Sequence, residues 1–112
     1  MKEIKAFIRA ERAEEVLDAL AEVGVTNATL THVLSWGPYV DPGRGKVSLE
    51  FGRAVNLMVK LEVICPDQEE DRLLEVARRA ACTGQSGDGV LSVTTVNRLV
   101  KIHDVAESVE AL

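Results

Sequence analysis

Apolar and polar residues alternate at the start of the chain and then change their period. Over residues 2–9, Ile4, Ala6 and Ile8 share one side, which is the pattern of a half-buried β-strand. Over residues 12–23 the apolar positions recur every three or four residues and are followed by a glycine, which predicts an amphipathic helix. The order of strand, helix and glycine returns later, so the pattern indicates two related halves.

The second half of the chain carries the strongest alternation, over residues 57–65, and Pro66 ends this predicted strand. Asp67 and Glu70 are spaced like an N-cap residue and its capping-box partner. The alanine-rich helix that follows is expected to close at Gly84. Further strands are expected at residues 26–36, 90–96 and 98–103, and a short helix could occupy residues 104–112.

Residues 37–46 break the pattern with two prolines and three glycines, which is typical of a loop. The interval 47–53 could be a short hairpin arm or part of a longer excursion. We therefore expect one domain, residues 1–112, with a long flexible loop at about 37–55. The order of elements favours an α+β fold of the ferredoxin-like split βαβ type, βαββαβ, with two helices on one face of an antiparallel sheet.

The second face of this sheet would remain bare, with an outward set that includes Phe7, Val33, Met58 and Ile64. A bare apolar sheet face predicts an oligomer.

Composition and charge exclude some classes of function. The 112 residues include 18 acidic and 13 basic ones, a net charge of -5 that is the wrong sign for a nucleic-acid binder. No apolar run approaches the roughly 18 residues of a membrane span, and the first residues lack the apolar core of a signal peptide. We expect a cytoplasmic protein without membrane insertion.

The reactive side chains form no recognisable catalytic or metal site. Cys65 and Cys82 stand in apolar patterns without metal-ligand spacing, so buried reduced thiols are expected in preference to a metal or redox pair. His32 is expected to be structural. No nucleophile elbow or carboxylate pair is present, so an enzyme is not predicted.

A glycine-rich loop is the main candidate binding motif. Gly84, Gly87 and Gly89 around Asp88 could turn successive backbone N–H groups toward an anion. The loop follows a helix and precedes a strand, so it is not a Walker A loop. A helix C-cap followed by a simple turn is the alternative.

Several segments resemble the P-II nitrogen-regulatory signalling proteins. The loop 83–89, TGQSGDG, is similar to the nucleotide-binding loop of that family, and segments 21–25, 59–63 and 100–103 match its first helix, third strand and last strand in register. The resemblance implies a homotrimer with adenine nucleotides bound between subunits. It also implies a long loop that docks on a target, which would be a membrane transporter's cytosolic face or a metabolic enzyme.

The resemblance implies two sets of site residues. The nucleotide set comprises Thr29, Gly37, Glu62, Ile64, Gly84, Gly87, Asp88, Gly89, Lys101 and His103. The partner-binding set, on the long loop, comprises Tyr39, Arg44, Lys46, Phe51 and Arg53.

Departures from the family pattern alter the expected effectors. Val90 and Pro38 replace basic residues, and His103 replaces an arginine, so we expect AMP or ADP to bind in preference to ATP. Tyr39 and Met58 replace a glutamine and a lysine used for 2-oxoglutarate, so no response to it is expected. Phe51 replaces the tyrosine that some members have uridylylated.

A second function stays open. The chain could be a trimeric ferredoxin-like binding module that uses no nucleotide and takes a small anion, or that resembles the divalent-cation tolerance proteins. The retained Gly87-Asp88-Gly89 favours the nucleotide sensor, and the lost basic residues favour this alternative.

Overall fold

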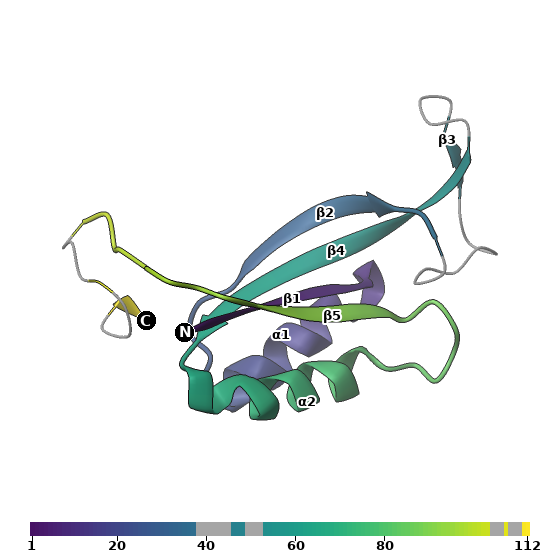
Figure 1. Ribbon diagram of the computed structural model, residues 1–112. Helices are drawn as coiled ribbons and strands as arrows, with labels where there is room; N and C mark the ends of the chain where they lie inside the picture. The colour runs from purple at the N-terminus through teal and green to yellow at the C-terminus, as the bar shows by residue number, and fades with distance from the viewer. Residues whose placement is uncertain (38–45, 49–52, 104–106, 108–110) are drawn as a thin grey trace.

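The computed structural model describes residues 1–37, 46–48, 53–103, 107 and 111–112. Two helices cover one face of an antiparallel sheet (Figure 1), which confirms the predicted ferredoxin-like α+β class. The strands lie in the order β2-β4-β1-β5, and β3 pairs with β4 beside this path. The elements are β1 (Lys2–Arg9), α1 (Ala13–Glu22), β2 (Thr29–Ser35), β3 (Lys46–Ser48), β4 (Arg53–Cys65), α2 (Glu70–Ala81) and β5 (Gly89–Thr95), with short 3-10 turns at Ala10–Arg12 and Asp67–Glu69.

The core lies between the sheet and the two helices. It takes the alternate apolar residues of β1 and β4 together with one stripe of each helix, as the two periods predict. These buried residues are Ile4, Ala6, Ile8, Val59, Leu61, Val63, Cys65, Val16, Leu20, Leu73, Ala77 and Ala81. Arg12 joins the two helices, because its guanidinium donates to the Ala80 carbonyl at the end of α2 (Nη2 2.6 Å, Nε 3.1 Å).

The segment predicted as a loop contains a hairpin. β3 pairs with the first three residues of β4, so β4 begins at Arg53 and runs for 13 residues instead of starting at 57. The hairpin-arm alternative is therefore correct, and the paired strands extend away from the helices (Figure 1). Tyr39, Arg44 and Phe51 lie outside the described residues.

The predicted strand at 98–103 is wrong. β5 is an edge strand whose Thr95 lies opposite Lys2, at the start of β1. The Val96 amide still donates to the Met1 carbonyl (3.0 Å). Beyond that point β1 offers no further partner. The chain leaves the sheet, and among its described residues the strand pairing there is an isolated bridge, Val100 with Glu107. The helix expected at 104–112 falls largely outside the described residues.

The capping box at Asp67 and Glu70 is also wrong. Asp67 begins a 3-10 turn, and no side chain caps either this turn or α2. The Asp67 carboxylate instead pairs with the Met1 ammonium (2.8 Å), which lowers the pKa of Asp67. α2 ends at Ala81 because Cys82 is extended (ψ 125°), so Gly84 belongs to the following loop.

The bare outer face is less apolar than predicted. Met58 is only 3% exposed, and the face carries charged residues such as Lys5, Lys60 and Glu62 between the half-buried Phe7, Val33 and Ile64. The exposed large apolar side chains lie elsewhere, mostly along β2 and the adjoining part of β4. This apolar patch comprises Leu30, Leu34, Trp36 and Leu57.

Candidate functional site

The glycine loop, residues 83–89, connects α2 to β5 and is shaped by positive φ angles. Gly84, Gly87 and Gly89 have φ values of 83°, 89° and 113°, which side-chain-bearing residues rarely adopt. Gly89 has a second constraint, because a Cβ atom there would lie 1.8 Å from the Phe7 carbonyl oxygen. The glycines in this loop therefore have two physical reasons: the backbone adopts positive φ angles, and at Gly89 it passes too close to β1 for a side chain.

Asp88 organises the loop from inside. Its carboxylate accepts hydrogen bonds from the amides of Thr83 (2.8 Å) and Gly84 (3.2 Å), and from the Thr83 hydroxyl. The Gln85 amide donates to the Thr83 hydroxyl oxygen (3.2 Å). The first amides of the loop are therefore used internally, and the prediction that the loop turns its donors to an anion can apply only to the amides from Ser86 onward.

Arg9 supplies the charge opposite Asp88. Its Nε donates to Asp88 Oδ1 (2.9 Å) and its Nη2 to the Ser86 carbonyl (2.8 Å). Burial by itself would raise the pKa of Asp88. The hydrogen bonds from the Thr83 hydroxyl, from Arg9 and from the two backbone amides outweigh burial and lower that pKa to about 2. Asp88 is therefore ionised at neutral pH.

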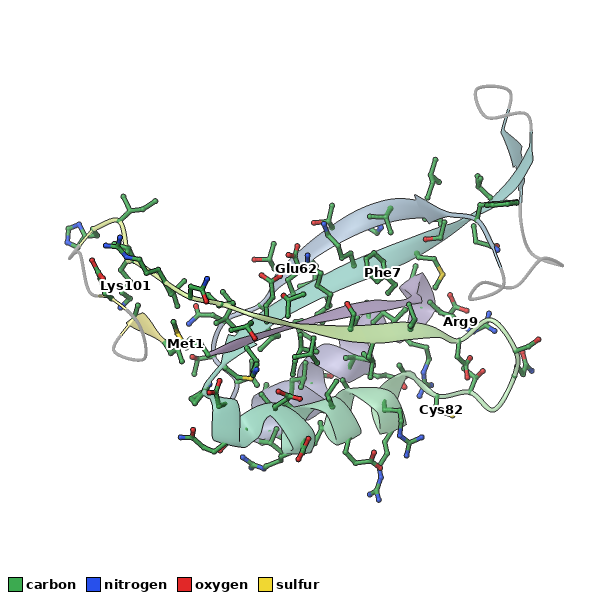
Figure 2. The ribbon with its side chains drawn as sticks, in the orientation of Figure 1. Met1, Phe7, Arg9, Glu62, Cys82 and Lys101 are labelled. Carbon is green, nitrogen blue, oxygen red and sulfur yellow. The ribbon has the colours of Figure 1, made fainter. Side chains whose placement is uncertain are left out.

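Sequence reasoning missed Arg9. The alternation of β1 places Arg9 on the side opposite Ile4, Ala6 and Ile8, where solvent exposure is expected, whereas the structure leaves it only 5% exposed, at the end of β1 (Figure 2). The available signal was Asp88 itself. It is the one carboxylate within TGQSGDG, and a partly buried carboxylate requires a cation or several donors.

A cavity of about 580 Å³ lies at the opposite end of β1. Its walls come from the segment after α1, the end of β4, the start of α2 and the C-terminal tail. The lining includes the predicted residues Thr29, Glu62, Ile64 and Lys101, together with Arg72 and Leu112. Glu62 also pairs with Lys60 (3.5 Å) on the outer face.

The predicted nucleotide set is thus divided between two places in one chain. Thr29, Glu62, Ile64 and Lys101 line the cavity, and the glycine loop lies at the other end of β1. Cys65 pairs with Lys2 and Gly89 pairs with Ile8, so six residues of strand, about 20 Å, separate the two ends. Figure 2 shows Arg9 and Lys101 at opposite ends of the molecule.

The remaining predicted residues fall outside these two groups. Gly37 follows β2 and has a φ of 123°, at the end of the sheet that carries the glycine loop. His103 is exposed on the tail and does not line the cavity. Lys46 and Arg53 begin β3 and β4, and their side chains lie outside the described residues. Trp36, which stands next to Gly37 after β2, is 66% exposed.

The two cysteines differ in their exposure to solvent. Cys65 is buried in the core, as predicted, and burial raises its pKa. Cys82 is exposed, which corrects the prediction, because it is the extended residue after the end of α2 and so leaves the helix stripe that faces the core. Among the described residues, no group of three or more His, Cys, Asp or Glu side chains could hold a metal ion.

The geometry defines a small ferredoxin-like α+β domain with a glycine loop at one end of β1 and a cavity at the other. The family profile for nitrogen regulatory protein P-II matches residues 1–105, and this chain belongs to that P-II family. The nitrogen regulatory protein P-II 1 of Escherichia coli strain K12 is 35% identical over 118 aligned residues, covering all of both chains. The P-II proteins of Haemophilus influenzae (32%) and Pasteurella multocida (31%) are similar over the same full length.

Proposed function

We propose that this protein is a regulator that binds an adenine nucleotide in clefts between the subunits of a homotrimer. The division of the site carries the proposal. In each chain the cavity lined by Thr29 and Lys101 and the glycine loop lie about 20 Å apart, so a single chain cannot close both around one small ligand. Two copies that bring the loop of one beside the cavity of the next would complete the site.

The apolar patch supports assembly of several copies. Leu34 pairs with Leu57, and the two side chains are 56% and 57% exposed although their strand face is the one that carries the core. Leu30 and Trp36 extend the same patch. A second copy that covers these side chains would remove apolar surface from water, which is the general driving force of association.

The lost basic residues support a preference for AMP or ADP over ATP. Val90 follows the glycine loop without a charge, and the loop already contains the Asp88 carboxylate. Lys101 lines the cavity and is the cation we assign to the phosphate groups. Fewer phosphate charges suit a site with fewer cations.

The protein would act on another protein. The relatives are named for nitrogen regulation, so we propose a transporter or enzyme of nitrogen metabolism as the target, contacted by residues 37–55 in the cytoplasm. No helix among the described residues is long and apolar enough to cross a membrane. We propose that the protein acts by binding its ligand and its target, and that it is not an enzyme.

Two measurements test the proposal. Sedimentation should give three times the 12.2 kDa chain mass, and Leu57→Ser should weaken the assembly. Ile102→Ser is the matched control, because Ile102 is an exposed apolar residue of the tail. Calorimetry with AMP, ADP and ATP should detect binding, with ATP the weakest. A stable monomer would contradict the assembly, and binding of no adenine nucleotide would favour the nucleotide-independent module.

A further inference from the structure

The contact between Arg9 and the glycine loop has a consequence for ligand binding. We propose that Arg9 is a positioning residue that neutralises Asp88 and so allows the glycine loop to accept a phosphate group. This inference rests on the proposed nucleotide binding, and it assigns to that site a residue from a different element, β1.

The geometry gives Arg9 two contacts in the loop. One nitrogen donates to the Asp88 carboxylate (2.9 Å) and another to the Ser86 carbonyl (2.8 Å). These contacts flank Gly87, which stands between them in the chain. Arg9 is only 5% exposed, so its guanidinium makes these contacts largely shielded from water. A guanidinium held in this way fixes the second half of the loop relative to the sheet.

The charge of Asp88 opposes phosphate binding in the loop. An ionised carboxylate in a phosphate-binding loop would repel the phosphate, because like charges at short range oppose each other. The Arg9–Asp88 pair carries no net charge, so the amides from Ser86 onward can face an anion. Hydrogen bonds from Thr83 and from Arg9 outweigh burial and keep the pKa of Asp88 low, so the carboxylate is charged throughout the neutral range and requires this neutralisation.

Val90 increases the importance of Arg9. The first residue after the loop is apolar and half-buried, so it provides no charge to balance Asp88. A purely structural Arg9 would affect AMP, ADP and ATP equally. An Arg9 that offsets Asp88 has a larger effect on ligands with more phosphate charge, and this difference separates the two roles.

The experiment compares Arg9→Met with Arg12→Met by calorimetry with AMP, ADP and ATP. Arg12 is a matched control, because its guanidinium also donates to a backbone carbonyl, that of Ala80, and it forms its ion pair with Glu15. Arg9→Met should weaken ADP binding about ten-fold or more and ATP binding further than AMP binding. Equal losses for the three nucleotides in Arg9→Met would overturn the inference.

Two further variants keep the test decisive. In the double variant Arg9→Met/Asp88→Asn the repelling charge is gone, so the ATP-to-AMP affinity ratio should return toward that of the unaltered protein. If Arg9→Met does not fold, Arg9→Lys replaces it. Arg9→Lys keeps the positive charge but loses the planar guanidinium with its two separate donors. It should therefore leave the ATP-to-AMP affinity ratio within about two-fold of that of the unaltered protein. A ratio that shifts further in Arg9→Lys would overturn the neutralising role.

A ligand-free measurement separates this inference from the proposed function. In an NMR titration, the pKa of Asp88 should lie near 2 in the unaltered protein and rise when Arg9 is replaced by Met. An unchanged Asp88 pKa would overturn the role of Arg9, whatever nucleotides bind. If the unaltered protein binds no adenine nucleotide while the Asp88 pKa responds to Arg9, the proposed function fails, the phosphate role of Arg9 fails with it, and only the electrostatic contact remains.

Discussion

The two ends of β1 carry different kinds of candidate site. At the Arg9 end the glycine loop is held by internal contacts. The Asp88 carboxylate accepts hydrogen bonds from the first amides of the loop, and Arg9 forms an ion pair with the same carboxylate. At the Lys2 end an open cavity is lined by segments that belong to four different parts of the chain. One end therefore depends on backbone shape and an internal ion pair, and the other on how separate segments come together. Substitutions at the first end should affect folding more strongly than substitutions at the second.

The largest effect is expected from Gly89→Ala. Its Cβ would overlap the Phe7 carbonyl oxygen at 1.8 Å, so the loop or the β1–β5 pairing must shift, at a cost of about 3 kcal/mol or more. Gly84→Ala is the matched control. Its φ is also positive, at 83°, but nothing lies within 4 Å, so only the conformational cost of about 1–2 kcal/mol applies. Urea unfolding measures both, and equal losses would refute the close-approach argument.

The next effect concerns Asp88. Asp88→Asn should reduce the free energy of unfolding by about 1–3 kcal/mol, because Arg9 would lose its charged partner. The folded pKa of about 2 lies below the unfolded value of about 3.9, so this stabilisation is complete above about pH 4 and disappears as the pH falls toward 2.

Glu75 provides a comparison for this pH effect. Hydrogen bonds from Arg78, the larger cause, and from Arg79 also lower the pKa of Glu75 to about 2. The Glu75 carboxylate, however, is exposed to solvent on α2. Solvent screens such pairs, so Glu75→Gln should change acid stability far less than Asp88→Asn. Equal acid sensitivity of the two variants, measured by unfolding at pH 2 to 5, would show that the partly enclosed loop has no special role.

The sequence predicted the parts of the molecule that depend on local periodicity. Strand β1 and both helices follow from the spacing of their own apolar residues, and the glycine loop was found because glycine has a direct conformational meaning. The end of β5 could not be found in this way. It depends on where β1 begins, 93 residues away, as the pairing of Lys2 with Thr95 shows.

The candidate site was harder to predict than the fold. An aspartate inside the glycine loop was informative, but its partner Arg9 lies 79 residues away, and the strand pattern gave no sign that Arg9 is buried. The exposure of Cys82 depended on a single extended residue after α2. The resemblance identified the cavity residues, and only the three-dimensional structure shows that they lie at the other end of the sheet from the loop.

At the cavity end we expect an effect on binding alone. Lys101→Met should weaken ADP binding about ten-fold by removing a charged donor, and it should change the urea midpoint much less than Asp88→Asn does, because Lys101 is exposed on the tail. Arg79→Met is the control, since Arg79 is an exposed cation on α2 that does not line the cavity. A Lys101→Met variant that binds ADP normally would remove this residue from the site.

The smallest effect is expected for 2-oxoglutarate. Met58, which stands where the resemblance implies a lysine, lies opposite Arg9 at the glycine-loop end and is 3% exposed. A buried thioether offers neither a positive charge nor a strong donor to a dicarboxylate. Calorimetry with 2-oxoglutarate in the presence of Mg-ATP should therefore give no binding heat. Measurable binding would mean that another cation serves this end of the sheet, and the difference between the two ends would then be smaller than we infer.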